Sequence, residues 1–263
     1  MKYMIDGYMW NINGNEQNAI FRRALQILNS FDFHEKEWNH EVVTLEINED
    51  TIVCKFNKVQ KVYKEISKTD VYPILYSLLY ELEMKECRVF AHSVVVFKEK
   101  NGLLILGDFH SGKTTLGNEF EKIGWKMVAA DQSILMVRDN SIMLYKGSKS
   151  QYDAEKCLDE KRVPLIKIKN VVLIRGLTVE GDVKVDNITG FNNIYRGTWS
   201  NFVWPWYTPL TNRMELIQLN DKYVKKLYNF FDQFSKLKFY SARGDSNGVA
   251  HFLDNLISKK FDY

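Results

Sequence analysis

The sequence has few cysteines and little excess charge of either sign. Its three cysteines are isolated, odd in number and without metal-ligand spacing, which excludes a disulfide framework and a zinc site: Cys54, Cys87 and Cys157. They are typical of reduced thiols in the core of a cytosolic protein. The net charge of +3 is too small to indicate a nucleic-acid or a membrane partner.

Long hydrophobic runs are also missing. No window approaches the apolar length needed to cross a bilayer, and the first ten residues meet Asp6 and Gly7 before an apolar run develops, unlike a signal peptide. There is no internal repeat, low-complexity tract or flexible linker. With 263 residues, 45% of them hydrophobic, the chain can bury a substantial core. We therefore expect a cytoplasmic protein.

Residues 1–85 show the patterns of a small α/β subdomain. Apolar residues at helical spacing predict an amphipathic helix over 17–30. The segments EVVTLEI and TIVCKF alternate around the turn at 48–50, which indicates a β-hairpin. Asp70 then has the place of a helix N-cap, with Pro73 in the first turn and a leucine-rich stripe behind it.

Residues 86–263 predict a second domain around a mixed sheet. The run VFAHSVVVF indicates one buried strand, LLIL a central strand, 114–123 a short helix that Gly124 stops, and WKMVAA a further strand before Asp131. A hairpin follows around Asp139 and Asn140. Residues 166–175 are strand-like and residues 186–212 loop-rich. Residues 221–236 predict an amphipathic helix whose apolar face holds Val224, Leu227, Phe231 and Phe234. A strand and a last helix over 249–257 follow. The predicted fold class is α/β (α+β mixed sheet).

The segment from Gly107 to Thr114 matches the phosphate-loop pattern G-x-x-x-x-G-K-[ST] at every fixed position. The two glycines allow a tight loop whose backbone N–H groups turn inward, and the helix that follows offers unpaired N–H groups to phosphate oxygens. Lys113 supplies a compact charge to the β- and γ-phosphates, and the Thr114 hydroxyl is placed to ligate Mg²⁺. We expect nucleotide contacts from Gly107, Asp108, Phe109, His110, Ser111, Gly112, Lys113, Thr114 and Thr115.

A phosphate loop also needs a carboxylate near the metal. Asp131 ends an apolar strand soon after the phosphate-loop helix, where sheet geometry aims a side chain at the loop. Alone, it could equally cap a turn. Together with the loop, it predicts a second ligand of Mg²⁺ and a catalytic acid or base.

These segments resemble the HPr kinase/phosphorylase family, whose fold is related to phosphoenolpyruvate carboxykinase. That family places a histidine-bearing strand before the loop Gly-Asp-Ser-Gly-x-Gly-Lys-Ser, and an Ala-Asp-Asp strand after the helix that follows. Here AHSVVVF, GLLILGDFHSGKTT and KIGWKMVAADQ occupy these places over roughly residues 88–138. The resemblance implies an ATP- and Mg²⁺-dependent kinase acting on a hydroxyl, typically serine of a protein or peptide substrate, with His92, Lys113 and Asp131 catalytic.

The sequence departs from the family at three points. The paired acids become Ala130-Asp131, the loop interior holds the bulkier Phe109-His110, and the C-terminal phosphorylase segment is not found. Two other functions therefore stay open: a non-catalytic ATP-binding regulatory module, favoured by Ala130, and a small-molecule kinase of the same fold. A nucleotide hydrolase would need an arginine finger or a water-orienting glutamine, and the sequence offers neither in an obvious place.

Several further residues have two readings. Without the resemblance, His92 in its apolar strand is a core histidine, and His110 is as easily exposed as bound to phosphate. Phosphoryl transfer calls for more cations, for which the candidates are Arg175, Arg196 and Arg243. The aromatic segment 199–209 could grip a peptide, stack on a base, serve a homo-oligomer interface, or form a satellite core.

Overall fold

The computed structural model of the chain describes residues 1–5, 7–30, 41–86, 88–99, 101–108, 110–148, 165–190, 192–194, 198, 201–202 and 221–258. It divides into two compact units: the first comprises residues 1–87, 151–153 and 204–224, and the second comprises residues 88–150, 154–203 and 225–263. Both units combine helices with a sheet of mixed strand direction, so the predicted α/β class is confirmed. None of the helices in the described ranges is long and apolar enough to cross a membrane.

The first unit is a five-stranded sheet with two helices. In chain order its elements are β1 (Lys2–Ile5), β2 (Tyr8–Gly14), α1 (Ala19–Asn29), β3 (Val42–Asn48), β4 (Thr51–Phe56), β5 (Val59–Tyr63) and α2 (Val71–Lys85). The strands lie in sequence order, and only β2 and β3, which α1 connects, are parallel. The predicted helices and the β3–β4 hairpin are confirmed. Cys54 is buried and free, as predicted, while Cys87 and Cys157 lie outside the described residues.

The second unit holds the phosphate loop. Its elements are β6 (Val89–His92), β7 (Val94–Lys98), β8 (Asn101–Leu106), α3 (Lys113–Lys122), β9 (Lys126–Ala129), β10 (Gln132–Arg138), β11 (Ser141–Gly147), β12 (Ile166–Thr178), β13 (Lys184–Ile188), α5 (Asp221–Phe234), β14 (Lys238–Asp245) and α6 (Ser246–Ser258). The strand order is β6-β10-β11-β12-β8-β7-β9, and β14 pairs with both β12 and β13.

Three parallel strands form the middle of this sheet. β12 lies between β8 and β14, with Leu173 opposite Leu106 and Ile174 opposite Ala242. Every residue of β8 is buried, in agreement with the central strand that LLIL predicts. Because the three strands run the same way, their carboxyl ends meet at one edge, which is where ligands bind in open α/β sheets. The phosphate loop leaves β8 at this edge.

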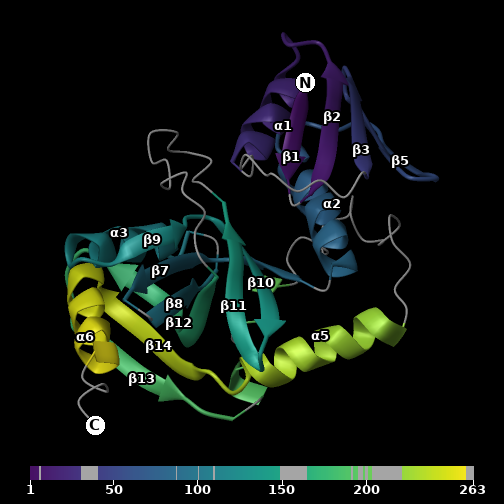
Figure 1. Ribbon diagram of the computed structural model, residues 1–263. Helices are drawn as coiled ribbons and strands as arrows, with labels where there is room; N and C mark the ends of the chain where they lie inside the picture. The colour runs from purple at the N-terminus through teal and green to yellow at the C-terminus, as the bar shows by residue number, and fades with distance from the viewer. Residues whose placement is uncertain are drawn as a thin grey trace. The chain divides into compact units, whose positions relative to one another are not determined.

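Hydrophobic residues are buried on both faces of the sheet. On one face α3 and α6 pack together, as Figure 1 shows, and bury a cluster that includes Leu116, Phe120 and Leu253. On the other face Phe202 packs against Phe230 and Phe234 of α5, mostly edge to face. Phe202 belongs to the predicted aromatic segment, so this residue of it is core; the segment's tryptophans lie outside the described residues.

Three local predictions are wrong. The run VFAHSVVVF is two strands, because the chain changes neighbours at Ser93: β6 pairs with β10, whereas β7 pairs with β8 and β9. Residues 186–188, predicted as loop, belong to β13, an edge strand whose exposed side chains gave no apolar signal. Val224 on α5 is 55% exposed rather than buried, since the residues that meet the core lie further along the helix.

Candidate functional site

The backbone of the phosphate loop takes conformations that favour glycine. Gly107 has φ +156° and Gly112 has φ +94°. A Cβ on Gly107 would lie 2.6 Å from Ser111 Oγ, and one on Gly112 would lie 3.0 Å from Leu177 Cδ1 on β12. The loop is therefore closed around itself and against the neighbouring strand, and glycine is needed at both fixed positions of the motif.

Helix α3 begins directly after the loop. Gly112 is its N-cap, and no side chain caps the helix. The first N–H groups of an α-helix have no acceptor inside the helix, and the helix dipole makes this end positive, so an anion is favoured here. Thr114 and Thr115 are exposed in the first turn, and the exposed His110 has a left-handed φ of 57°. Phe109, the other predicted loop contact, lies outside the described residues.

Lys113 is folded back into the loop. Its side chain is only 6% exposed, and Nζ donates to the carbonyl oxygens of Gly107 (3.0 Å) and Asp108 (2.9 Å). Burial lowers the pKa of Lys113 to about 8, against the opposing pull of the Asp131 and Asp108 carboxylates. An ammonium has three donors, and the third has no partner within the described residues, so it is available to a phosphate oxygen.

The structure brings His92 and Asp131 together at the same edge. His92 ends β6 and Asp131 follows β9, and the Ser93 N–H donates to the Asp131 carbonyl at 3.0 Å. His92 Nε2 lies 3.6 Å from Asp131 Oδ1, within ion-pair range but beyond a hydrogen bond. Burial first, and then the charges of Lys113 and His110, lower the pKa of His92 to about 3. These terms outweigh the attraction of the carboxylate, so the imidazole is neutral at pH 7.

Asn201 is a residue of this site that the sequence did not predict. Its side chain is buried, and Nδ2 donates both to the Gly107 carbonyl (2.8 Å) and to the His92 carbonyl (3.1 Å). One amide thus joins the start of the phosphate loop to the end of β6. The Oδ1 atom of Asn201 and the Oγ atom of Ser111 are buried without a hydrogen-bond partner in the described part of the chain.

The arginine candidates separate in the structure. Arg175 and Arg243 are exposed near the carboxyl ends of β12 and β14, at the same edge as the phosphate loop. Arg196 lies outside the described residues. Ala130, which stands where the resemblance places a first acid, is buried in the hydrophobic cluster under α3. The roles predicted for the site residues remain predictions, but Lys113, His92 and Asp131 are close enough for their charges to interact.

The lowered pKa of Lys113 predicts how ATP affinity depends on pH. Below about pH 8 the ammonium is already protonated, whereas above it the site must take up a proton when phosphate binds. We expect ATP affinity to fall about tenfold per pH unit from pH 8 upward, measured by calorimetric titration between pH 7.5 and 9.5. In Lys113→Arg the guanidinium stays charged, so this decline should vanish; equal declines in both proteins would contradict the assignment.

Comparison with known proteins adds little. No family model matches the chain, and no curated protein matches it. Among solved structures, the chain is similar to the structure of the Hpr(Ser) kinase/phosphatase from Coxiella burnetii, with a TM-score of 0.31 and 14% identity, over 65% of this chain and 95% of that one. This TM-score is too low to indicate a shared function, so the function is inferred from the residues of the site.

Proposed function

We propose that the chain is a phosphotransferase that transfers the γ-phosphoryl group of ATP, with Mg²⁺, to a hydroxyl, most simply a serine of a protein or peptide. The observation that carries the proposal is the meeting of three groups at one sheet edge: the phosphate loop with its buried Lys113, the carboxylate of Asp131, and the neutral His92 beside it. The resemblance of residues 88–138 to HPr kinases supports the same reaction.

The residues fit a nucleotide. The loop has the glycines that a close approach of phosphate requires, an uncapped helix N-terminus and a lysine with a spare donor. Beside the loop, Ser111 Oγ and Asn201 Oδ1 are buried and have no hydrogen-bond partner among the described residues. In this proposal the loop N–H groups and Lys113 bind the β- and γ-phosphates and neutralise the charge that develops on them during transfer.

The residues also fit Mg²⁺. The Thr114 hydroxyl is exposed in the first turn of α3, and the Asp131 carboxylate is 17% exposed after β9. Both are hard oxygen donors of the kind that Mg²⁺ prefers, alongside phosphate oxygens and water. Thr114 and Asp131 would hold the ion, which when bound supplies charge neutralisation at the phosphates.

Asp131 would also orient the acceptor hydroxyl and take its proton. A carboxylate can accept this proton as the hydroxyl oxygen attacks the phosphorus. The rest of phosphoryl transfer demands mainly positioning and charge stabilisation. His92 is neutral, so it does not add a positive charge beside Asp131, and it restricts the room available to that carboxylate.

Transfer of label from γ-labelled ATP tests the proposal. With Mg²⁺ we expect the wild-type chain to label an acceptor from a set of serine, threonine and tyrosine peptides and small alcohols. In Lys113→Ala, ATP affinity should fall about 10- to 150-fold, the equivalent of the 1.5–3 kcal/mol typical of a hydrogen bond to a charged group. Lys122→Ala, which removes an exposed lysine of the same helix, should bind ATP as the wild type does.

A regulatory ATP-binding module is the second candidate, favoured by the burial of Ala130 in the core. It predicts tight ATP binding with neither transfer nor turnover across the whole acceptor set, a result that would sink the kinase proposal. Label on a small alcohol but on no peptide would identify a small-molecule kinase instead. If Lys113→Ala bound ATP as tightly as the wild type, nucleotide binding at the phosphate loop itself would be refuted.

A further inference from the structure

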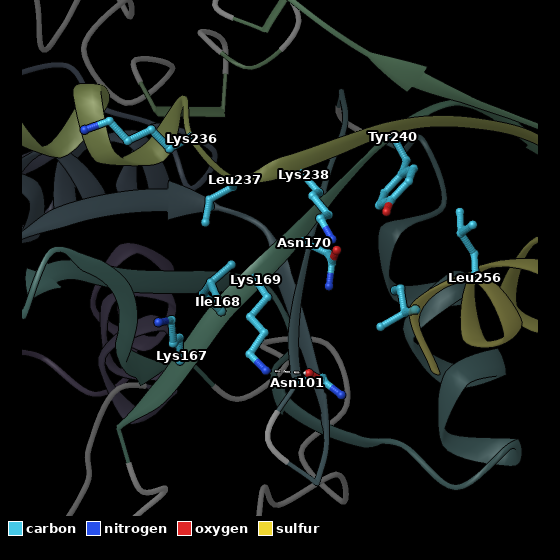
Figure 2. A pocket seen from close by; sticks show the side chains of 11 residues that line it. Asn101, Lys167, Ile168, Lys169, Asn170, Lys236, Leu237, Lys238, Tyr240 and Leu256 are labelled. Atoms are coloured by element: carbon cyan, nitrogen blue, oxygen red, sulfur yellow. Dashed lines mark hydrogen bonds between the residues drawn. The ribbon is translucent and has the colours of Figure 1, made fainter. Parts of the chain in front are cut away.

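A cavity lined by both polar and apolar side chains lies at the opposite edge of the same sheet. It has a volume of about 390 Å³ and is lined from the amino ends of the three parallel strands: Asn101 at the start of β8, residues 167–170 of β12, and Lys238 and Tyr240 of β14. Leu256 of α6, labelled in Figure 2, and its neighbour Ile257 complete the lining. Because parallel strands begin at one edge and end at the other, this cavity is separated from the phosphate loop by the length of β8.

The charged side chains around this cavity all have one sign. Lys167, Lys169, Lys236 and Lys238 line it, and its lining includes no carboxylate. Lys236 is paired with Asp232 at 2.7 Å, and Lys169 Nζ donates to Asn101 Oδ1 at 3.0 Å. Lys167 and Lys238 have no ion-pair partner among the residues that the structure describes. An excess of positive charge in a concave site raises the local concentration of anions.

Two polar side chains from residues that are otherwise buried line this cavity. Asn170 and Tyr240 are only 6% and 3% exposed, yet within the described ranges neither side chain makes a hydrogen bond. Figure 2 shows both among the side chains that line the cavity, together with the pair formed by Lys169 and Asn101. The polar atoms of Asn170 and Tyr240 are not sealed inside the core, so they are available to a ligand in the cavity. Burial also raises the pKa of Tyr240, so its hydroxyl stays a donor.

We propose that this cavity binds a small phosphorylated molecule, at a site separate from the phosphate loop. Lysine ammonium, asparagine amide and tyrosine hydroxyl groups all donate hydrogen bonds, which matches the acceptor oxygens of phosphate. The volume lies in the range of small-molecule sites, and the apolar walls from Leu237, Leu256 and Ile257 fit an organic body. The inference does not depend on the proposed kinase activity.

The test uses inorganic pyrophosphate and the full-length chain carrying Lys113→Ala, which weakens the phosphate loop. At 0.15 M salt, calorimetry should detect saturable binding, because diffuse surface attraction is largely screened there. Adding Lys169→Ala and Lys238→Ala should weaken it at least about tenfold. Adding Lys184→Ala instead, an exposed lysine outside the cavity, should change it less than twofold. No saturable binding, or equal binding in all variants, would overturn the proposal.

A conservative variant separates a built site from mere positive charge. Tyr240→Phe removes one hydroxyl that has no described protein partner, so the fold should be retained, and pyrophosphate should bind about 2- to 12-fold more weakly. Unchanged binding would contradict a role for the Tyr240 hydroxyl. Binding of a hexaglutamate peptide without binding of pyrophosphate would replace the proposal with an acidic-peptide site. In chains with an intact Lys113, the cavity variants should leave ATP affinity unaffected. The absence of pyrophosphate binding in the cavity would therefore not count against the proposed function.

Discussion

Replacing Asp131 by asparagine should lower phosphoryl transfer about 1,000-fold or more while ATP affinity changes less than tenfold. The amide keeps the size of the side chain and one oxygen for the metal, but it cannot accept the proton of the acceptor hydroxyl and carries no charge. Loss of a general base typically costs 10²- to 10⁴-fold, and loss of the metal-bound charge adds to this. Initial rates with γ-labelled ATP and calorimetric ATP titrations measure the two effects separately.

Asp139→Asn is the matched control. This aspartate is exposed in the turn between β10 and β11 with φ +50°, a conformation that asparagine also tolerates. The same chemical change far from the site should leave transfer and affinity unaltered. Equal rates for Asp131→Asn and the wild type would remove Asp131 from the mechanism, whereas parallel losses of rate and ATP affinity would restrict it to nucleotide binding.

Gly147→Ala should destabilise the second unit by about 3 kcal/mol. Gly147 ends β11 beside β9, and a Cβ there would lie 2.3 Å from the Val128 carbonyl and 2.4 Å from Ala129 Cβ. Backbone cannot yield as a flexible side chain can, so the methyl group must push the two strands apart. The Ala130 N–H donates to the Ser148 carbonyl just beyond, so the displacement should reach Asp131 and slow phosphoryl transfer as well.

Gly124→Ala provides the comparison for Gly147→Ala. Its added methyl group would meet nothing within 4 Å, and only the left-handed φ of +87° opposes it, at about 1–2 kcal/mol. Chemical denaturation of the three proteins should therefore give a larger loss of stability for Gly147→Ala than for Gly124→Ala. The reverse order would show that β11 and β9 are not in the close contact described.

Local patterns were sufficient wherever a short segment determines its own structure. The amphipathic stripe behind Asn18, whose side chain accepts from the N–H groups of Ile20 and Phe21, predicts α1. The phosphate loop is likewise contained in eight residues, with an apolar strand before it and a helix after it. The position of Asp131 near Lys113 could be predicted because the end of a strand has a fixed place relative to a neighbouring loop, whereas its role stays a prediction.

The remaining features depend on pairings that local patterns do not record. The three apolar residues on each side of the break, 89–91 and 94–96, are all buried, so no alternation reveals that β6 and β7 have different neighbours. Asn201 reaches His92 and Gly107 from about a hundred residues away. The cavity at the amino ends of β8, β12 and β14 forms only in the register that sets Lys238 opposite Asn170 on parallel strands.

If the phosphate loop binds a nucleotide as proposed, the hydrogen bonds of Lys113 would make that binding partly an exchange of partners. The Gly107 and Asp108 carbonyls already accept from two of the three donors of the ammonium, so a phosphate that displaces either carbonyl gains only the difference between its own attraction and that of the carbonyl. The same bonds keep the loop ordered before any ligand arrives, which reduces the entropy lost on binding. Such a preorganised loop favours ligands with several negative charges: a triphosphate outcompetes the carbonyls far better than a monophosphate does.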